Sequence, residues 1–395
     1  MYDLLTPEFR EDPYPTLRQM RRSDPVHFSP QLNAWLVTRY EDVVTGLAHP
    51  AISADRITPR INQFPEDSRA QFESLATMLR AWPLMADPPR HASVRKPVTS
   101  ALHQRIIRSF RPLVTRTVQE ILSGALSDGT LDAVDQLAVP VPLLVVSEII
   151  GIPRDGLDLL KRCAVDIVSF FGTPPATYLP TAAEALRSIS QANDFLKEII
   201  EQRRRSPRND MISTLLADPS ATTEKVAATC MMMVFAGFET TTNLLGNGLL
   251  LLMRHPDQRN ALREQPDLIP AAVEEMLRIE SPVQRLSRMA AMDLELNGKH
   301  IRAGDLVFFL TGAANHDPDV FPDPEKFDIH RKPTSHLAFG DWIHACPGAN
   351  LARLEAEIVF SELLKRTSSF TLQKEETWHD NLSVRALKEL PLKFS

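Results

Sequence analysis

The chain has 395 residues, of which 43% are hydrophobic and 24% are charged, so it has the composition of a globular protein with a large core. Its net charge of −6 argues against a general nucleic-acid binder. No signal segment and no apolar run long enough to span a membrane is visible, so a cytoplasmic protein is expected. We find no linker, repeat or low-complexity tract and therefore expect a single domain over residues 1–395.

Cysteine usage favours a reducing compartment. Cys163, Cys230 and Cys346 are far apart and odd in number, and they form neither a metal-type pair nor a CxxCH haem-attachment motif. On residue type alone, Cys346 is most simply a buried free thiol. Only Cys346 has a sequence context that indicates more.

Helical periodicity predominates in the first half of the chain. A short helix is predicted over residues 13–23, a strand over 34–39 and a helix over 41–48. Residues 51–70 mix proline and charge with little periodicity and are predicted to form a long loop. Another helix begins within residues 87–91, where proline suits the first turn. Further helices are predicted over residues 105–126, 141–150, 155–171, 180–204 and 208–217, with a break at Pro174-Pro175.

The longest predicted helix runs from Thr223 to Arg254. Thr222 or Thr223 is a suitable N-cap, and His255-Pro256 ends the helix. At ~1.5 Å per residue it would be roughly 45 Å long. Because it is apolar on nearly all sides, it should be buried. The rest of the chain predicts a helix over residues 270–279, strands over 288–296 and 300–310 joined by an Asn297-Gly298 turn, a loop-rich stretch over 313–339, a helix over 349–366 and closing strands. The sum is a mainly α fold with a minor β portion.

A short loop before the helix at residues 349–366 presents Cys346. A helix N-terminus and nearby cations favour a thiolate, and backbone amides aimed at the sulfur tune its electron density. The order of residues from His336 to Arg353 resembles the haem-binding signature of the cytochrome P-450 family. The resemblance covers nearly the whole chain and points to the soluble bacterial members. In the loop and the start of the next helix, the resemblance rests on Phe339, Gly340, His344, Cys346, Gly348 and residues 351–353.

The resemblance implies a single-domain cytochrome P-450 fold, with haem b held between the long central helix and the helix after the cysteine loop. In that family the cysteine thiolate, here Cys346, is the axial iron ligand and favours O–O cleavage. The resemblance also implies that His344 hydrogen-bonds a haem propionate. Gly348 would let the backbone pass close to the sulfur, where a side chain would intrude. One position departs from the family, because Trp342 stands where glycine is usual, so we expect either a different bend of the loop or backbone strain there.

The long helix carries the run Ala236-Gly-Phe-Glu-Thr-Thr-Thr242 at its middle. The simplest interpretation is that the threonines hydrogen-bond to carbonyls one turn earlier. A buried glutamate without a partner costs several kcal/mol, however, so polar surroundings are expected. The run resembles the family's acid–alcohol pair. This implies that Ala236 and Gly237 lie at the haem, that Gly237 leaves room for oxygen, that Thr240 steadies dioxygen and that Glu239 gates proton delivery.

Four cations occur in the order of the family's propionate-binding residues. His91 and Arg95 are four apart on one helix face, Arg288 lies at a strand start, and His344 lies in the cysteine loop. Each alone is as easily a surface cation. Jointly they favour carboxylate binding, since arginine holds carboxylates in a bidentate geometry.

Glu275 and Arg278 resemble the family's structural Glu–Arg pair. They are three apart on a predicted helix and therefore face each other, although that spacing is common. Residues 327–331 resemble the segment that supplies a further arginine to the pair. The role implied is to support the haem pocket rather than to take part in the chemistry.

We therefore expect a haem-thiolate monooxygenase that uses two electrons and one O2 and inserts one oxygen atom into a C–H or C=C bond. Electrons would come from NAD(P)H through a ferredoxin or flavodoxin and its reductase, because no reductase domain is recognised in the sequence. This partner would dock near the cysteine loop, where Arg353, Lys365 and Arg366 supply positive charge. A monomer without nucleic-acid or membrane partners is expected. The alternatives are a peroxide-driven haem-thiolate hydroxylase, disfavoured by Glu239 and Thr240, and a non-catalytic haem-binding sensor or ligand carrier.

The walls of a substrate cavity are placed by analogy with the family. They read as apolar with few aromatic residues, which favours a sizeable, mostly aliphatic substrate. The pattern around residues 236–243 and the chain end look most like members of bacterial secondary metabolism that oxidise polyketides, macrolactones or fatty acyl chains. Terpenoids and steroids are the alternative substrate classes. The predicted walls are residues 51–85, 168–179, 232–236, 283–286 and 383–384.

Overall fold

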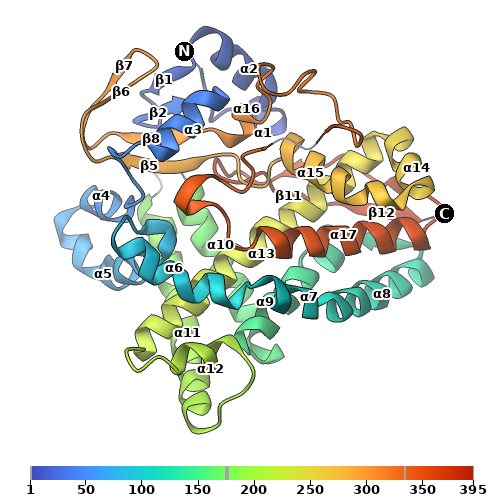
Figure 1. Cartoon of the computed structure of the whole chain (residues 1–395), viewed down its shortest axis with the longest axis horizontal. Helices are drawn as coiled ribbons and strands as arrows, with labels where there is room; N and C mark the ends of the chain where they lie inside the picture. Colours follow the sequence, from blue (N-terminus) through green and yellow to red (C-terminus); the bar gives the residue numbers. More distant parts are fainter. Residues whose placement is uncertain (1, 174–177, 333–334, 395) are drawn as a thin grey trace.

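A computed structural model describes residues 2–173, 178–332 and 335–394 (Figure 1). Helices make up most of the described chain and strands a minor part, so the predicted fold class is confirmed. The dipeptide Pro174-Pro175, predicted to break a helical connection, lies outside the described residues. None of the described helices combines the length and the apolarity needed to cross a bilayer.

The described helices fall into two groups along the chain. The first group is α1 (Pro7–Glu11), α2 (Tyr14–Ser23), α3 (Tyr40–Ala48), α4 (Ile57–Asn62), α5 (Glu66–Arg80), α6 (Arg90–Ala101), α7 (Gln104–Ser109), α8 (Arg111–Asp128), α9 (Pro140–Ile150), α10 (Leu157–Gly172) and α11 (Tyr178–Arg205). The second group is α12 (Met211–Leu216), α13 (Thr223–Arg254), α14 (Pro256–Glu264), α15 (Ile269–Ile279), α16 (Thr311–Ala314) and α17 (Ala349–Arg366).

The strands are short. They are β1 (Val26–Ser29), β2 (Ala34–Val37), β3 (Ile52–Ser53), β4 (Thr130–Asp132), β5 (Leu286–Ala290), β6 (Leu294–Leu296), β7 (Lys299–Ile301), β8 (Leu306–Phe309), β9 (Phe370–Leu372), β10 (Thr377–Trp378), β11 (Leu387–Glu389) and β12 (Pro391–Phe394).

Helix α13 crosses the middle of the molecule and is buried along most of its length (Figure 1). The Thr222 hydroxyl caps it by accepting a hydrogen bond from the Lys225 amide over 3.3 Å. The helix ends at Arg254, because Pro256 disfavours a helical conformation in the residue before it. These are the predicted bounds. Helices α9, α10, α11, α15 and α17 pack around α13 and hold its middle in place.

The main sheet joins strands from distant parts of the chain in the order β1-β2-β8-β5-β3. Strands β2 and β8 are parallel, and the other neighbours are antiparallel. In Figure 1 the blue N-terminal strands lie beside the orange strands β5 and β8. Alternate residues face two small apolar clusters, so Leu36 and Phe308 pack on one side and Val37 and Phe309 on the other. The sheet thereby anchors β5, which carries Arg288, at the edge of the larger core around α13.

Several element predictions differ from the structure. Residues 51–70 are not a loop, because β3, α4 and the start of α5 lie there. Residues 105–126 form two helices, since Pro112 suits the first turn of a new helix. Each of the strands predicted over 288–296 and 300–310 is two strands, because β5 pairs with β8 while β6 pairs with β7. The predicted hairpin turn at Asn297-Gly298 is confirmed, with both residues at positive φ.

Candidate active site

A cavity of about 350 Å³ lies between α13, the cysteine loop and β5. This volume is within the range of small-molecule sites, roughly 300–1,000 Å³. Two predicted site residues do not line it: His91, which stacks on the cavity residue His344, and Glu239. The predicted residues that line it are Arg95, Ala236, Gly237, Thr240, Arg288, Phe339, Gly340, His344, Cys346 and Gly348.

The cysteine loop presents the Cys346 sulfur to this cavity. The Cys346 amide donates a hydrogen bond to the Phe339 carbonyl over 2.8 Å, and Gly340 has a φ of 68°, which suits glycine. The side chain of Cys346 is open to the cavity but enclosed by protein, so burial raises the pKa of its thiol. Two amides at the start of α17, together with Arg95, oppose that rise. Amides and a cation directed at a sulfur are the setting that a metal-bound thiolate needs.

The space around the Cys346 sulfur does not require glycine at position 348. A β-carbon there would lie 3.8 Å from Cys346 Sγ and 3.9 Å from Leu102, which is ordinary van der Waals contact. The expectation that a side chain would intrude on the sulfur is therefore wrong as far as the protein atoms are concerned. What Gly348 gives the sulfur is a hydrogen bond from its amide.

Trp342 carries the backbone strain that its departure from glycine predicts. Its φ is 55°, in the left-handed region, and its side chain is 52% exposed. The Asp341 carboxylate accepts a hydrogen bond from the Trp342 amide over 2.7 Å, and the Trp342 carbonyl accepts one from the Ala345 amide over 3.1 Å. These two bonds hold the residue in its strained conformation, and the exposed indole offsets little of the strain by burial.

Trp342→Gly is expected to raise the free energy of unfolding by about 1 kcal/mol. A left-handed conformation costs other residues roughly 1–2 kcal/mol, and the greater entropy that glycine loses on folding reduces the gain. Trp342→Ala is the matched control, because it removes the indole and keeps the strain. Urea denaturation of both variants measures the difference, and equal stabilities would show that the backbone is not strained.

A cluster of cations lies beside the cysteine loop. His91 and His344 stack edge to face with ring centroids 4.5 Å apart, and Arg95 donates to the Ala345 carbonyl. Arg288 is 7% exposed and lines the cavity. Desolvation and then the charge of Arg288 lower the pKa of His344 to about 3, so this ring is neutral. His91 Nε2 is buried and has no hydrogen-bond partner within the described part of the chain.

Arg56 belongs to the same cluster and was missed in the sequence. It precedes α4, and its guanidinium donates to the Leu84 carbonyl over 3.2 Å. Its charge acts on Arg288 and on His344. In the described ranges no carboxylate forms an ion pair with Arg56, Arg95 or Arg288. Three arginines and an unpartnered histidine nitrogen without a carboxylate are the donor set that two propionates would satisfy.

The middle of α13 forms another wall of the cavity. A β-carbon on Gly237 would lie 2.7 Å from a methyl group of Val146 on α9, so helix packing requires glycine here. The Thr240 hydroxyl donates to the Ala236 carbonyl over 3.0 Å. This is the local bond of the simplest interpretation, yet Thr240 also lines the cavity. The hydroxyl therefore has both a helical partner and access to whatever binds in the cavity.

Glu239 precedes the cavity residue Thr240 on α13 but does not itself line the cavity. Burial raises the pKa of its carboxyl to about 7, and Lys161 opposes the rise. A group with a pKa close to neutrality both takes up and releases protons at physiological pH. Polar surroundings were expected for this carboxyl. Lys161 supplies one favourable charge, and the raised pKa shows that burial outweighs it.

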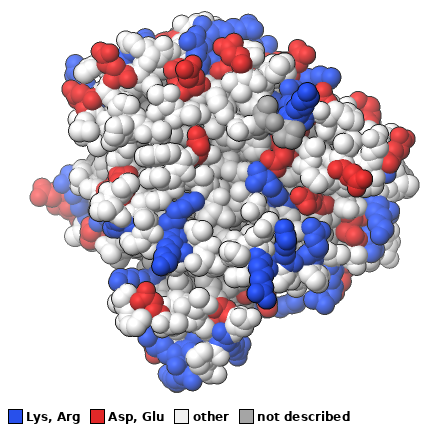
Figure 2. All heavy atoms as spheres, viewed as in Figure 1, with Lys and Arg blue, Asp and Glu red and all other residues white. Residues whose placement is uncertain are grey.

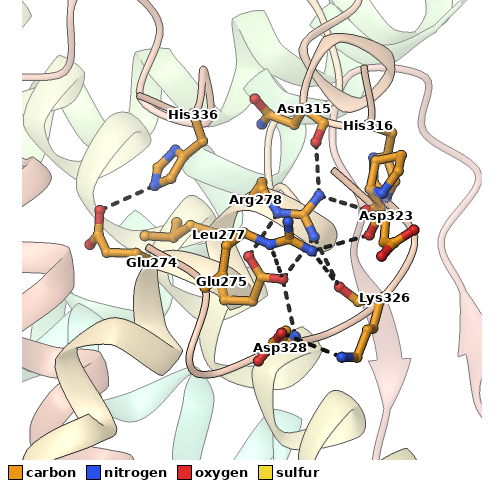
Figure 3. A network of polar contacts seen from close by, with 12 residues as sticks. Glu274, Glu275, Leu277, Arg278, Asn315, His316, Asp323, Lys326, Asp328 and His336 are labelled. Atoms are coloured by element: carbon orange, nitrogen blue, oxygen red, sulfur yellow. Dashed lines mark hydrogen bonds and ion pairs between the residues drawn. The ribbon is translucent and has the colours of Figure 1, made fainter. Parts of the chain in front are cut away.

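The Glu275–Arg278 pair is buried and bonded to two further segments (Figure 3). Arg278 donates two hydrogen bonds to the Glu275 carboxylate, over 2.7 and 2.8 Å, and the side chains are 1% and 3% exposed. Arg331 contacts the same carboxylate at 2.9 Å, and the Asp328 amide donates to it over 3.1 Å. Arg278 also donates to the Asn315 carbonyl over 2.9 Å. The predicted pair and its additional arginine are confirmed.

Known proteins share this sequence and architecture. A family model, Cytochrome P450, matches residues 157–394. The chain belongs to the cytochrome P450 family. It is 36% identical over 393 residues to the Biotin biosynthesis cytochrome P450 of Bacillus subtilis (strain 168), covering 98% of this chain and 97% of the relative. It is 32% identical over 408 residues to the Polyketide biosynthesis cytochrome P450 PksS of the same organism, covering 98% and 97%. The crystal structure of P450BioI with a hexadec-9Z-enoic acid ligated acyl carrier protein matches with a TM-score of 0.92 at 36% identity, over 98% of this chain and 100% of that one.

As a cytochrome P450, the protein is a monooxygenase whose haem iron is bound by a cysteine thiolate and which uses O2 and electrons from NAD(P)H supplied through partner proteins. The residues present fit that haem. Cys346 faces the cavity with amides directed at its sulfur, and the unpaired arginines lie beside the same loop. The predicted enzyme class and cofactor are therefore confirmed.

The P450 cavity has walls from all the predicted segments, with two corrections. Aromatic side chains are more frequent there than expected: Phe171, Tyr178, Phe235 and Phe308. The walls also hold arginines that the apolar interpretation missed. Both lie inside the predicted walls, Arg60 within residues 51–85 and Arg285 within residues 283–286, but no role was predicted for either.

The expected docking charge is largely paired in the structure. Arg353 forms a bidentate ion pair with Glu274, over 2.6 and 2.9 Å, and its guanidinium stacks 4.6 Å from the Phe339 ring centroid. Arg366 pairs with Glu362 at 3.0 Å. Arg353 therefore has a local role beside the cysteine loop, and its charge is only partly available to steer a partner.

Proposed function

We propose that this P450 is a single-domain enzyme that inserts one oxygen atom into a C–H or C=C bond of a sizeable, mostly aliphatic small molecule. The observation that carries the proposal is one shared cavity, which both Cys346 and Thr240 line. Bound haem supplies oxygen activation. The protein holds the haem and the substrate in position, keeps water out of the cavity and delivers protons.

The cation cluster holds the haem in one orientation. Arg95 and Arg288 are placed to bind the propionates, with His344 in the cavity wall and His91 behind it. The buried Nε2 of His91 gains a partner when a carboxylate arrives. Planar guanidiniums bind carboxylates through two parallel hydrogen bonds, so the cluster fixes both the position of the haem and the orientation of its plane.

Protons reach the cavity from α13. The Thr240 hydroxyl can donate either to the Ala236 carbonyl or into the cavity, because it lies on the cavity wall. Glu239, one residue earlier, has a pKa of about 7 and resupplies the proton. Together the acid and the alcohol deliver protons to the reacting oxygen without opening the site to bulk water.

Thr240→Ala is expected to keep haem and substrate binding but to lower the product formed per NADPH by at least about tenfold, since a positioned proton donor contributes roughly 10²–10⁴-fold. The reducing equivalents should appear as peroxide. Thr229→Ala is the matched control, because Thr229 makes the same type of bond, to the Lys225 carbonyl over 2.8 Å, on the same helix and outside the cavity lining. Equal coupling in the two variants would limit Thr240 to its helical bond.

The substrate class rests on the apolar walls and on the relatives. Valine, leucine and methionine side chains from several helices surround the space above Cys346 and favour an alkyl chain. The names of two relatives state a fatty acyl ligand and polyketide biosynthesis, which are both aliphatic chemistries. The apolar side chains that line the cavity include Val146, Val168, Met232, Met233, Leu244 and Val283.

A ferredoxin or flavodoxin, reduced by its own reductase, is the proposed electron donor of a monomeric, cytoplasmic enzyme. Figure 2 shows Lys and Arg side chains over α6, α7 and α17 on one face of the molecule. This face includes the helix that follows Cys346, so a small acidic protein bound there would lie near the haem.

Reconstitution tests the proposal. The haem-loaded protein is supplied with a surrogate ferredoxin, its reductase and NADPH, and is presented with a panel of aliphatic acids, macrolactones and polyketides. We expect oxygenated product that depends on NADPH and O2. Product formed only with added peroxide would indicate a peroxide-driven hydroxylase, and binding without any product would indicate a ligand carrier.

A further inference from the structure

Arg60 and Arg285 line the cavity next to Arg56, the member of the cysteine-loop cation cluster on which both of their charges act. Arg285 is 7% exposed, and it donates to the Ser383 hydroxyl over 3.2 Å and to the Phe171 carbonyl over 3.4 Å. Arg60 donates to the Thr173 carbonyl over 3.4 Å, and its Nε is buried with no hydrogen-bond partner among the residues that the structure describes. Both arginines line the cavity.

The two guanidiniums are close enough to repel each other. Burial lowers the pKa of Arg285 to about 9, and the charge of Arg60 adds to this effect. Tyr178 is the group that opposes the loss of charge at both arginines. Within the described residues, neither arginine forms an ion pair with a carboxylate. Two like charges in an enclosed apolar space are unfavourable unless something anionic joins them.

Aromatic faces compensate these charges in part. The Arg60 guanidinium lies 3.8 Å from the Tyr178 ring centroid and 4.4 Å from that of Phe170. The Arg285 guanidinium lies 4.0 Å from the Phe308 ring centroid. Stacking occupies the faces of a guanidinium and leaves its edge, where the N–H donors lie, free for an acceptor.

Haem does not account for this second pair. Its two propionates are matched by Arg95 and Arg288 beside the cysteine loop, with Arg56 as a third cation there. Arg56 borders both groups of cations, since its guanidinium lies 5.5 Å from the Phe171 ring centroid. Arg60 and Arg285, unlike Arg56, hydrogen-bond to the segment from Phe171 to Thr173 and to Ser383. These residues belong to the predicted substrate walls, so the missing anion belongs to the substrate.

We propose that Arg60 and Arg285 form an anion-binding subsite and that the substrate of this P450 is an aliphatic carboxylic acid whose carboxylate lies between the two guanidiniums. The proposal rests on the proposed function, since it specifies the head group of the molecule to be oxidised. The apolar walls contact the alkyl chain, and the two arginines hold its carboxylate end.

Binding to the ferric haem protein tests this directly through the substrate-induced shift of the haem spectrum. The probes are tetradecanoic acid, its primary amide and its N-acetylcysteamine thioester, which share one chain and differ in head-group charge. We expect the acid to bind roughly 10- to 100-fold more tightly than the two neutral probes, the range for a charge-assisted hydrogen bond. Equal binding of acid and amide, or tighter binding of the thioester, overturns the proposal, the latter in favour of a carrier-bound acyl chain.

Variants locate the effect. Arg285→Met and Arg60→Met should each weaken acid binding by roughly tenfold or more and change amide binding by less than about threefold. Arg285→Lys, which keeps the charge without the planar fork, should lie between. Arg187→Met removes an exposed arginine of α11 and should change neither. Loss of amide binding to the same extent as acid binding in both Met variants would show a packing role only.

Failure of this proposal differs from failure of the proposed function. If the reduced carbonyl complex shows the thiolate spectrum and neutral compounds are oxidised with NADPH, while acids have no advantage, only the subsite is refuted. If that spectrum is absent or NADPH gives no product from any compound, the proposed function itself fails. Should one Met variant not fold, the other variant and the wild-type comparison of acid with amide still decide.

Discussion

Cys346→Ser is expected to abolish the red-shifted Soret band of the reduced carbonyl complex and all NADPH-dependent oxygenation. A serine hydroxyl is not deprotonated as a thiol is and is a poorer donor to haem iron, so the electron density that favours O–O cleavage is lost. The loop itself should persist, because the bond from the amide of residue 346 to the Phe339 carbonyl involves only the backbone. A reduced carbonyl spectrum of the variant measures the outcome.

Cys163→Ala is the control for loss of a cysteine. Cys163 is fully buried, and burial raises the pKa of its thiol far above neutrality, so it is inert. This variant should keep the red-shifted band at full intensity. If Cys346→Ser retained the band, thiolate ligation by Cys346 would be refuted and the assignment of the whole site would fail with it.

Glu275→Ala is expected to lower the free energy of unfolding by roughly 3–5 kcal/mol, the usual cost of removing one partner of a buried ion pair. The cost is high because Arg278 and Arg331 would both lose the carboxylate that they share. Arg278 is 1% exposed and cannot turn to water. Urea denaturation of the haem-loaded protein gives the change, and haem content per chain shows whether the pocket survives.

An exposed pair of the same chemistry provides the control. Glu73 and Arg80 lie 2.8 Å apart, with side chains 57% and 30% exposed. Glu73→Ala should cost less than about 1 kcal/mol, as exposed ion pairs do. Similar losses in the two variants would mean that the buried network contributes no more than a surface contact.

Periodicity predicted the long elements well and the short ones poorly. The bounds of α13 and α17 were predicted correctly, because each is long, apolar along the buried face and delimited by a threonine cap, a proline or a glycine. Helix α5 was missed because its first turns, from Glu66 to Gln71, are polar and its buried positions begin only at Phe72. Helix α4 has too few residues for a period to show.

The site was predictable where a loop motif carries it and unpredictable where distant segments meet. The cysteine loop and the acid–alcohol pair are each contiguous, so order alone identified them. Arg56, Arg60 and Arg285 acquire meaning only when α4, α10 and β5 come together around one cavity. No local pattern marks an arginine as unpaired, since pairing depends on which segments the fold brings within reach.

The guanidiniums of Arg278 and Arg331 bind backbone carbonyls of the irregular segment 315–331, which a neighbouring strand would bind in a sheet. Arg278 donates to the carbonyls of Asn315, Pro324 and Lys326, and Arg331 donates to those of Pro322 and Asp323. These side-chain bonds add to the backbone turn bonds of a segment that contains no strand (Figure 3). Neither guanidinium lines the cavity, so this network fixes the path of the chain toward the cysteine loop from outside the site.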